Sequence, residues 1–578
     1  MDSEPIYQGR YVSWGPPGTG KTTWMATQVK TICQRLAGLT FPLDTPVIVC
    51  SLTRAAAAEA AGRDLPIDRG SVGTLHSFAY RSLGSPAVSH SRIAEWNEEF
   101  KDCQIGESTT TLDEPAWDRK PGGKAGDELT AKYDVLRAKM VPRILWPEVV
   151  QEFAAMWEDW KKQTGTIDFT DMIELAWRNC PNAPGNPAVV LADEVQDYSR
   201  LEIELLNAWG DNAGATIITG DPWQALYTWR GADPDAPFNQ HLGPDREKVL
   251  SQSYRIPVAV HATAMRWIEK LSTYRPIEYK PRDAPGEVRF SDGTFASPGK
   301  LVNEAAEYLD QGKSVMFAAS CGYFLDPLIK TLRGRGIPFA NPWRAKRGDW
   351  NPLKLGGKGI TMPQRILSFL ALDAECGRGK WWNAEELQAW ASVLEAKGLM
   401  LRGGKKNIER RLDADDQAAV DKALPDLTGA DLLEWFDPEQ IRAICNLFFR
   451  RNESHNTAGQ SDVPLAALLD WWQSRLLAGK GKAAEYPLSV ISGSGPQALK
   501  ERPRLYVGTI HSFKGGEADC VFLCPDLSPA GYREWLSNGE GRDSVMRLMY
   551  VGITRAKEKL ILCDQSTTLA ANVAREVA

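Results

Sequence analysis

The chain has 578 residues, and at about 150 residues per domain this length predicts roughly four domains or subdomains. Charged residues make up 25% of the sequence and hydrophobic residues 43%, a balance that excludes a disordered or collagen-like protein. The formal net charge of −6 is too small to indicate a partner, so binding to any anionic polymer must depend on local basic surfaces.

The sequence carries no sign of a membrane span, a secretory signal or a zinc site. Its apolar runs are all shorter than the roughly 18 residues of a membrane helix, and the first residues, MDSEP, are acidic where a signal peptide is basic. The 10 cysteines include no CxxC pair, so they are expected to be reduced thiols. These features predict a cytoplasmic protein without membrane contact.

Seven short apolar runs have the composition of buried strands, and helical patterns separate most of them. This alternation predicts an α/β fold built on parallel sheets. Two stretches, residues 79–166 and 344–497, break the alternation and are interpreted as inserted, mainly helical subdomains. The strand-like runs are residues 11–14, 46–51, 188–193, 215–221, 314–320, 520–524 and 559–564.

A glycine-rich segment follows the first of these runs and precedes a helical pattern. Residues 15–22, GPPGTGKT, fit GxxxxGK[ST], in which backbone N–H groups approach phosphate oxygens and the following helix adds a favourable dipole. Lys21 is expected to reach the outer phosphates and Thr22 the Mg²⁺ ion. The predicted nucleotide-binding residues are Gly15, Pro16, Pro17, Gly18, Thr19, Gly20, Lys21, Thr22 and Thr23.

A P-loop needs a second carboxylate site, and the segment AVVLADEVQD supplies one at the end of an apolar run. Asp193 is expected to hold Mg²⁺ through water, at the same ion as Thr22. Glu194 is then placed to orient and deprotonate the attacking water. The pairing predicts hydrolysis of a nucleoside triphosphate.

Residues 217–234, IITGDPWQALYTWRGADP, combine a glutamine with interleaved aromatic side chains. Gln224 can sense the γ-phosphate. Tyr227 and Trp229 can stack on bases, a contact worth about 1–3 kcal/mol that tolerates any base sequence. The alternative, that both aromatic residues belong to the core, stays open at this point.

These motifs and their order resemble superfamily 1 helicases of the UvrD/Rep/PcrA type. Further segments extend the resemblance over nearly the whole chain, from Gly15 to Ala556. They are VCSLTRAA (49–56), GTLHSF (73–78), IDFTDMI (167–173), LSQSYR (250–255), GTIHSFKGGEAD (508–519) and RLMYVGITRA (547–556).

The resemblance implies two RecA-like parallel-sheet cores, each with a mainly helical insertion. It also implies an ATP-dependent helicase that moves 3′ to 5′ along single-stranded DNA and acts at junctions with duplex DNA. ATP and Mg²⁺ are the expected cofactors, and a monomer is expected. The expected boundaries are 1–78 and 167–249 for core 1A, 79–166 for insertion 1B, 250–343 and 498–578 for core 2A, and 344–497 for insertion 2B.

The resemblance also assigns roles to residues of the second core. Arg255 and Arg555 are expected to reach the γ-phosphate, where a planar guanidinium suits developing negative charge. Tyr254 is expected to stack on adenine, with a core position as its alternative, and Glu517 to accept a hydrogen bond from the ribose. The expected catalytic residues are Lys21, Glu194, Gln224, Arg255 and Arg555.

On the DNA side, hydroxyl groups and arginine suit phosphates, whereas rings suit bases. For His76 and His511, a satisfied core position is the open alternative. The residues that the resemblance assigns to DNA are Thr53, Arg54, Thr74, His76, Tyr227, Trp229, Arg230, Thr509 and His511.

The sequence departs from the family pattern in several places, among them Trp223, Ala225 and Gly516, which remove no catalytic group. Only fourteen residues precede Gly15, too few for the usual upstream adenine-reading segment, and Gln8 is a weak substitute, so loose selectivity for adenine is expected. Ser51 and Leu52 replace an aromatic residue that is common in the family, which puts one stacking platform in doubt. The chain ends 23 residues after Arg555, so any nuclease is expected to be a separate protein.

Two other functions remain alternatives. The first is a DNA-stimulated translocase without productive unwinding, which clears proteins or serves a partner nuclease in repair, phage replication or phage defence. The second is an ATP-gated scaffold of the AAA type that shares only GPPGTGKT. The segments from residue 217 onwards argue against this second alternative.

Overall fold

The chain divides into two compact units in the computed structural model. The first unit comprises Met1–Ala296, Val315–Leu325 and Gly508–Ala578, and the second comprises Ser297–Ser314 and Asp326–Val507. Among the helices of the described ranges, none combines the length and the hydropathy that a bilayer crossing requires. The structure describes residues 8–36, 47–51, 65–106, 124–239, 242–357, 359–372, 382–410, 429–455, 463–571 and 573–577.

The first unit contains a six-stranded parallel sheet with the order β3-β2-β4-β5-β1-β6. All the strands are parallel, so the segments that follow β1 and β4 leave the sheet at the same carboxyl edge. These two segments lie near one another because only β5 separates β4 from β1. The strands are β1 (Gly9–Trp14), β2 (Val47–Ser51), β3 (Val72–Thr74), β4 (Val189–Ala192), β5 (Ala215–Gly220) and β6 (Glu247–Val249).

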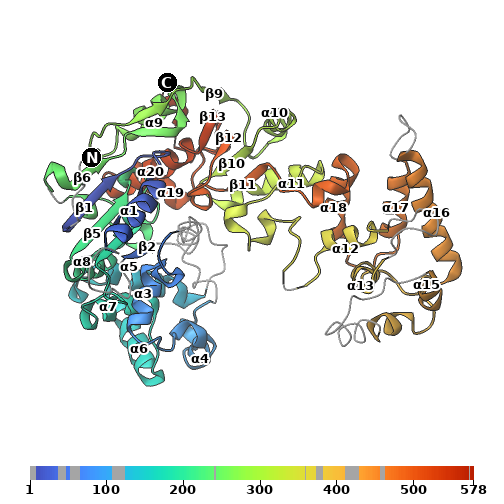
Figure 1. The fold of residues 1–578 in the computed structure, drawn as a ribbon, viewed down its shortest axis with the longest axis horizontal. Helices are drawn as coiled ribbons and strands as arrows, with labels where there is room; N and C mark the ends of the chain where they lie inside the picture. Colours follow the sequence, from blue (N-terminus) through green and yellow to red (C-terminus); the bar gives the residue numbers. More distant parts are fainter. Residues whose placement is uncertain are drawn as a thin grey trace. The chain divides into compact units, whose positions relative to one another are not determined.

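Helices cover both faces of this sheet because successive strand residues point to opposite sides. Val47 and Val49 of β2 pack with the buried side of α1 (Lys21–Leu36), whereas Ile48 of the same strand packs on the other face. That other face is covered by α3 (Leu75–Ser82), α7 (Phe169–Asn179) and α8 (Arg200–Ala213), which lie together below β1, β2 and β5 in Figure 1.

A second parallel sheet has the order β11-β10-β12-β13-β9. Its edge strand β11 carries the chain into the first unit at Gly508. The mostly buried helix α20 (Glu540–Ile553) packs with α9 (Val258–Ile268) and α19 (Pro529–Leu536) and ends just before Arg555. The strands are β9 (Glu287–Ser291), β10 (Val315–Ala319), β11 (Leu505–Thr509), β12 (Ala518–Leu523) and β13 (Ala556–Cys563).

A separate pair of parallel strands, β7 (Gln252–Pro257) and β8 (Lys280–Arg282), also belongs to the first unit. All seven strand-like runs predicted from the sequence are strands, and the prediction of parallel α/β sheets is confirmed. The predicted runs correspond to β1, β2, β4, β5, β10, β12 and β13.

The described residues between α3 and α7 fold as helices around an aromatic cluster. The ring of Trp96 meets that of Trp157 edge-on at 4.9 Å and that of Trp160 at 5.6 Å. The helices are α4 (Ile93–Glu99), α5 (Ala125–Ala138) and α6 (Glu148–Thr164).

The second unit is mainly helical in its described part and packs its own aromatic cluster. Phe369 stacks on Trp382 at 6.2 Å and on Trp471 at 5.8 Å. The borders of the subdomains expected from the sequence remain a prediction. The helices are α10 (Gly299–Asp310), α11 (Asp326–Gly334), α12 (Met362–Phe369), α13 (Ala384–Ala391), α15 (Gly429–Trp435), α16 (Pro438–His455), α17 (Val463–Gln473) and α18 (Gly481–Ser494).

Candidate active site

The glycine-rich segment forms a tight loop between β1 and α1. The N–H of Gly15 donates to the carbonyl of Gly220 at the end of β5, at 3.0 Å. Lys21, the first residue of α1, folds back over the loop and donates from Nζ to the Gly15 carbonyl at 2.6 Å. A Cβ on Gly15 would lie 2.2 Å from Cγ of Lys21, so this arrangement requires glycine there. The loop therefore presents a lysine and a helix N-terminus to a phosphate.

Two carboxylates follow β4 at the same edge of the sheet. Asp193 is buried, and its N–H donates to the carbonyl of Cys50 on β2 at 2.9 Å. Glu194 has φ 55°, a left-handed conformation that is uncommon outside glycine. Oε1 of Glu194 lies 3.9 Å from Nζ of Lys21. The P-loop and both acidic residues thus share one site.

The two carboxylates titrate differently. Burial and the neighbouring Glu194 raise the pKa of Asp193 to about 7. Burial also acts to raise the pKa of Glu194, but Lys514 and Lys21 outweigh it and lower that pKa to about 2. Glu194 is therefore charged at neutral pH, and its Oε2 accepts a hydrogen bond from Nε2 of Gln196 at 2.6 Å.

The predicted magnesium ligands fit this charge distribution. Thr22 and Asp193 offer hard oxygen donors, and Asp193 is a buried carboxyl group beside Glu194, whose negative charge a divalent cation would help to offset. The described residues contain no group of three His, Cys, Asp or Glu side chains that could hold a metal by themselves. Such a site fits Mg²⁺ that takes its other ligands from phosphates and water.

Arg555 and Gln224 join the two sheets at this site. Arg555 is 1% exposed and donates from Nε to the Val551 carbonyl at 2.9 Å and from Nη1 to the Gly516 carbonyl at 3.1 Å. Its Nη2 donates to Oε1 of Gln224, which follows β5, at 3.0 Å. Burial and then Arg255 lower the pKa of Arg555 to about 9, so its guanidinium keeps its charge at neutral pH.

Arg255 and Tyr254 lie on β7 against the P-loop. The Tyr254 N–H donates to the Gly18 carbonyl at 2.8 Å, whereas its side chain is 73% exposed. The core alternative for Tyr254 is therefore not supported. Nε of Arg255 donates to Oε2 of Glu517 at 2.7 Å. Glu517, which was expected to accept a hydrogen bond from the ribose, therefore pairs with Arg255 in this structure.

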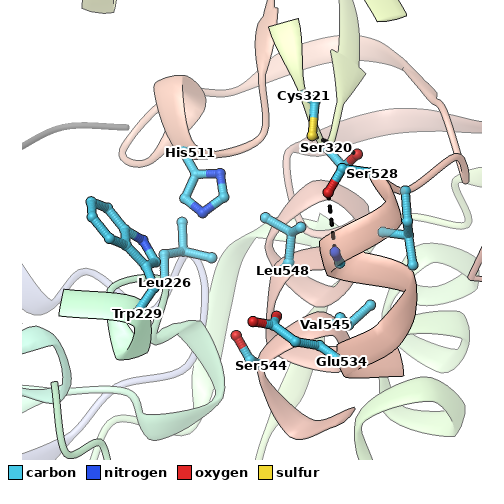
Figure 2. A pocket seen from close by; sticks show the side chains of 12 residues that line it. Leu226, Trp229, Ser320, Cys321, His511, Ser528, Glu534, Ser544, Val545 and Leu548 are labelled. Atoms are coloured by element: carbon cyan, nitrogen blue, oxygen red, sulfur yellow. Dashed lines mark hydrogen bonds between the residues drawn. The ribbon is translucent and has the colours of Figure 1, made fainter. Parts of the chain in front are cut away.

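The aromatic residues of the 217–234 segment differ in exposure. Tyr227 is 2% exposed, with Cζ of Arg230 and Nζ of Lys514 each 5.6 Å from its ring centroid. This burial favours a packing role for Tyr227. Trp229 is half-buried and lines a small cavity of about 20 Å³. Figure 2 shows its indole beside the imidazole of His511 at one end of this cavity.

The remaining residues expected to contact DNA have local partners. Nδ1 of His76 lies 3.5 Å from Oε1 of Glu202, and burial lowers the pKa of His76. The same residue lines a cavity of about 220 Å³ together with Arg230 and Trp229. The Thr74 side chain caps α3 by accepting from the Ser77 N–H at 3.1 Å.

Two of the expected DNA contacts in the second core are buried. Oγ1 of the buried Thr509 accepts from the Ser512 N–H at 3.3 Å, and His511 is also buried. The other two expected contacts, Thr53 and Arg54, lie outside the described residues.

Comparison with known proteins finds matches at both ends of the chain. Residues 6–240 match the UvrD/REP helicase N-terminal domain, and residues 504–563 match the UvrD-like helicase C-terminal domain. The chain belongs to the UvrD/REP helicase family.

Some relatives match most of this helicase, and others match one segment of it. DNA helicase II of Escherichia coli (strain K12) is 23% identical over 86% of this chain and 74% of its own length. The protein of the same name from Salmonella typhimurium is 22% identical over the same shares. An ATP-dependent helicase/nuclease protein of Staphylococcus aureus (strain bovine RF122 / ET3-1) is 26% identical over 22% of this chain and 13% of its own length.

One charged residue of the helicase's site was missed from the sequence. Nζ of Lys514 lies 3.1 Å from Oε2 of Glu194 and also pairs with Asp197, which is buried. Lys514 stands in the segment GTIHSFKGGEAD, between His511 and Glu517, and the segment itself was the available signal. A lysine inside a motif does not reveal which distant carboxylates it faces.

Proposed function

We propose that this ATP-dependent DNA helicase binds Mg-ATP between its two parallel sheets and uses hydrolysis to move 3′ to 5′ along single-stranded DNA and to separate duplex DNA. The observation that carries the proposal is the 3.0 Å hydrogen bond between Arg555 and Gln224 beside the P-loop. It supports a single nucleotide site to which both cores contribute.

The proposed chemistry uses the groups of this chain as follows. Lys21 and the backbone N–H groups of the P-loop bind the phosphates, and Glu194 orients the attacking water and accepts its proton. Arg255 and Arg555 stabilise the negative charge that develops in the transition state. A magnesium ion bound by Thr22 and Asp193 would supply charge neutralisation on the phosphate oxygens.

Coupling to movement is proposed to follow from the position of the DNA-side residues. Nucleotide binding favours the state in which Arg255 and Arg555 reach the phosphates, and product release favours the other state. Trp229 follows β5 and His511 follows β11, and the two side chains line the same cavity. A change between the states alters that cavity and thereby the grip on a stacked base.

Single-stranded DNA and its junctions with duplex DNA are the proposed substrates. The names of the long relatives, DNA helicase II, support DNA as the polymer. The proposed contacts retain Thr53, Arg54, Thr74, His76, Trp229, Arg230, Thr509 and His511. The polarity and the monomeric state rest on the family resemblance, whereas the cytoplasmic location rests on the sequence features described first.

The test combines hydrolysis and strand separation with the purified full chain. We expect single-stranded DNA to stimulate ATP hydrolysis more than duplex DNA or RNA does. We also expect displacement of a labelled strand from duplexes with a 3′ tail and none from matched duplexes with a 5′ tail. Displacement from the 5′-tailed substrate alone would overturn the polarity, and absence of DNA stimulation would overturn the proposed function.

A second candidate is a DNA-stimulated translocase that works with a separate nuclease. The similarity to the helicase/nuclease protein of Staphylococcus aureus over 154 residues favours it. This candidate predicts strong stimulation of ATP hydrolysis by single-stranded DNA with no strand displacement by the isolated chain. The same two assays therefore separate the two candidates.

A further inference from the structure

One carbonyl of the P-loop is held by two hydroxyl groups from outside the loop. The Pro17 carbonyl accepts from Oγ of Ser253 at 3.0 Å and from Oη of Tyr279 at 2.8 Å. Ser253 lies on β7, Tyr279 comes just before β8, and both side chains are buried. Tyr279 lies outside all the segments that carry the family resemblance, and that resemblance gave Ser253 no role.

The direction of the Ser253 hydroxyl proton follows from its other partners. Its oxygen accepts from the N–H of Arg255 at 3.3 Å and from the N–H of Ile256 at 3.1 Å. A serine hydroxyl has one donor and two acceptor positions, so with both acceptor positions occupied the hydroxyl acts only as a donor to its remaining neighbours, the Pro17 carbonyl and the Tyr279 hydroxyl.

The ring and the backbone of Tyr279 are also held by neighbouring residues. Nε2 of His261, on α9, lies 3.1 Å from the Tyr279 carbonyl oxygen, and the two rings are 4.6 Å apart. Lys280, the next residue, pairs with Gln252 of β7, and this strand pairing sets the position of the Tyr279 backbone. Burial raises the pKa of Tyr279, so its hydroxyl keeps the proton that it donates.

Holding the Pro17 carbonyl also orients the next N–H group. A trans peptide is planar and points its C=O and N–H in opposite directions, so the Gly18 N–H is directed away from Ser253 and Tyr279. Pro16 and Pro17 have no N–H, and the N–H of Gly15 is already bound to Gly220. Gly18 therefore supplies the first N–H that the loop can offer to a phosphate.

Only glycine fits at this peptide. Gly18 has φ 75°, and a Cβ there would lie 2.5 Å from Cβ of Arg255 and 2.7 Å from Oγ of Ser253. The Gly18 carbonyl is held as well, by the N–H of Tyr254. The strand β7 is thus packed directly against the phosphate-binding loop.

We propose that Ser253 and Tyr279 are positioning residues that set the orientation of the Pro17–Gly18 peptide and so tune the affinity of the P-loop for nucleotide phosphates. Because Ser253 also binds the N–H of Arg255, the same hydroxyl links the loop to that arginine. The inference rests on the P-loop binding ATP, as proposed above. It adds that full affinity for nucleotide depends on two hydroxyls from outside the P-loop core.

The test removes one oxygen atom from the full chain. Tyr279→Phe deletes the hydroxyl and keeps the ring, and the loss of one neutral hydrogen bond is expected to weaken nucleotide binding about threefold to tenfold. We expect this increase both in the dissociation constant for a fluorescent ADP analogue and in the KM for ATP. The kcat at saturating ATP and DNA is expected to stay within about twofold, a split that general destabilisation does not produce.

The matched control is Tyr486→Phe in the second unit. Tyr486 is also a buried tyrosine whose hydroxyl donates to a backbone carbonyl, that of Ile337, at 2.9 Å. Its variant is expected to bind the ADP analogue with wild-type affinity. A second variant, Ser253→Ala, is expected to weaken binding at least as much as Tyr279→Phe, because it removes one donor and two acceptor contacts.

The outcomes separate this inference from the proposed function. If the wild-type chain binds no ADP analogue and hydrolyses no ATP, the proposed function fails and this inference with it. If the wild type binds but Tyr279→Phe binds equally well, or loses only kcat, the inference alone is overturned. An equal loss in Tyr486→Phe would also overturn it, since the effect would then not be specific to the P-loop.

Discussion

Nη2 of Arg555 and Oε1 of Gln224 are 3.0 Å apart although the two residues are separated by 331 positions in the sequence. Gln224 in turn donates to Oδ2 of Asp221 at 2.7 Å, so a continuous chain of polar contacts runs from one sheet to the other. This contact holds the Arg555 side chain beside the P-loop through protein groups alone.

Arg555→Lys is expected to lower kcat by at least about 100-fold with little change in the KM for ATP. A lysine has one compact charge and cannot repeat the hydrogen bonds that the guanidinium makes from all three of its nitrogens. Steady-state ATP hydrolysis with saturating single-stranded DNA measures the effect. Arg475→Lys is the control, because Arg475 donates to Oε1 of Gln440 at 2.9 Å in the second unit. A kcat near the wild-type value in Arg555→Lys would remove Arg555 from the proposed machinery.

Lys21→Ala is expected to abolish ATP hydrolysis, with a loss of more than about 100-fold, while binding to single-stranded DNA persists. The Nζ atom lies against the loop, where it donates to the Gly15 carbonyl. Hydrolysis and fluorescence anisotropy with a labelled oligonucleotide measure the two properties. Lys30→Ala alters an exposed lysine of the same helix and should change neither. Retained turnover in Lys21→Ala would count decisively against the assigned site.

Lys514→Met is expected to reduce both turnover and thermal stability. It leaves the buried Asp197 carboxylate without its cation and Glu194 with the more distant Lys21, and an uncompensated buried charge costs about 3–5 kcal/mol. Differential scanning fluorimetry and ATP hydrolysis measure the two losses. The double variant Asp197→Asn with Lys514→Met also removes the carboxylate charge that Lys514→Met leaves unpaired at position 197.

The double variant should regain part of the lost melting temperature and none of the lost kcat. Recovery of kcat along with stability would show that Lys514 acts only as a structural counter-ion. Lys514→Arg keeps the positive charge and is the conservative comparison.

Trp229→Ala is expected to keep the basal ATPase rate and to lose at least about tenfold of the stimulation by single-stranded DNA, because base stacking is worth about 1–3 kcal/mol. Tyr227→Ala provides the contrast. Its ring is buried beneath Arg230 and Lys514, so the expected result is a lower melting temperature. Unchanged DNA stimulation in Trp229→Ala would assign Trp229 to packing as well.

Asp134→Asn is expected to stabilise the helicase at pH 8 and to have little effect near pH 4. Burial and the neighbouring Asp168 raise the pKa of Asp134 to about 7, whereas an unfolded aspartate titrates near about 4. The folded state therefore binds this proton more tightly, and the wild type loses stability as pH rises from about 4 to 7. Asparagine removes that loss. Melting temperatures of both proteins across this range test it, and a constant difference would contradict the assignment.

The sequence was most informative where strands are buried on both faces. Such strands read as continuous apolar runs, as in residues 188–193 and 314–320. Strands β3 and β6 are three residues long, and β9 has only exposed and half-buried positions without regular alternation, so none of these strands stands out from a loop in the sequence. The P-loop and the acidic pair were found because their spacing is short and local.

The rest of the site depends on contacts between distant segments. Lys514, Ser253 and Tyr279 reach the P-loop side only through the packing of β7 and the second sheet, and single-sequence spacing carries no information on such pairings. Tyr227 and Trp229 are two residues apart with the same aromatic character, yet only the fold makes one buried and the other half-buried. The sequence pattern alone did not decide which of the two aromatic residues is available for stacking on bases.

The chain passes between the two units four times before it completes the second sheet. During translation, the first sheet has all six strands once β6 has left the ribosome, whereas β13, the partner of β9, is synthesised near the end. Because N-terminal parts fold first, a growing polypeptide carries a finished P-loop long before it carries Arg555. Under the proposed function, ribosomal release anywhere between β12 and Arg555 would leave a product that has the P-loop and Glu194 but lacks the arginine proposed to complete the site.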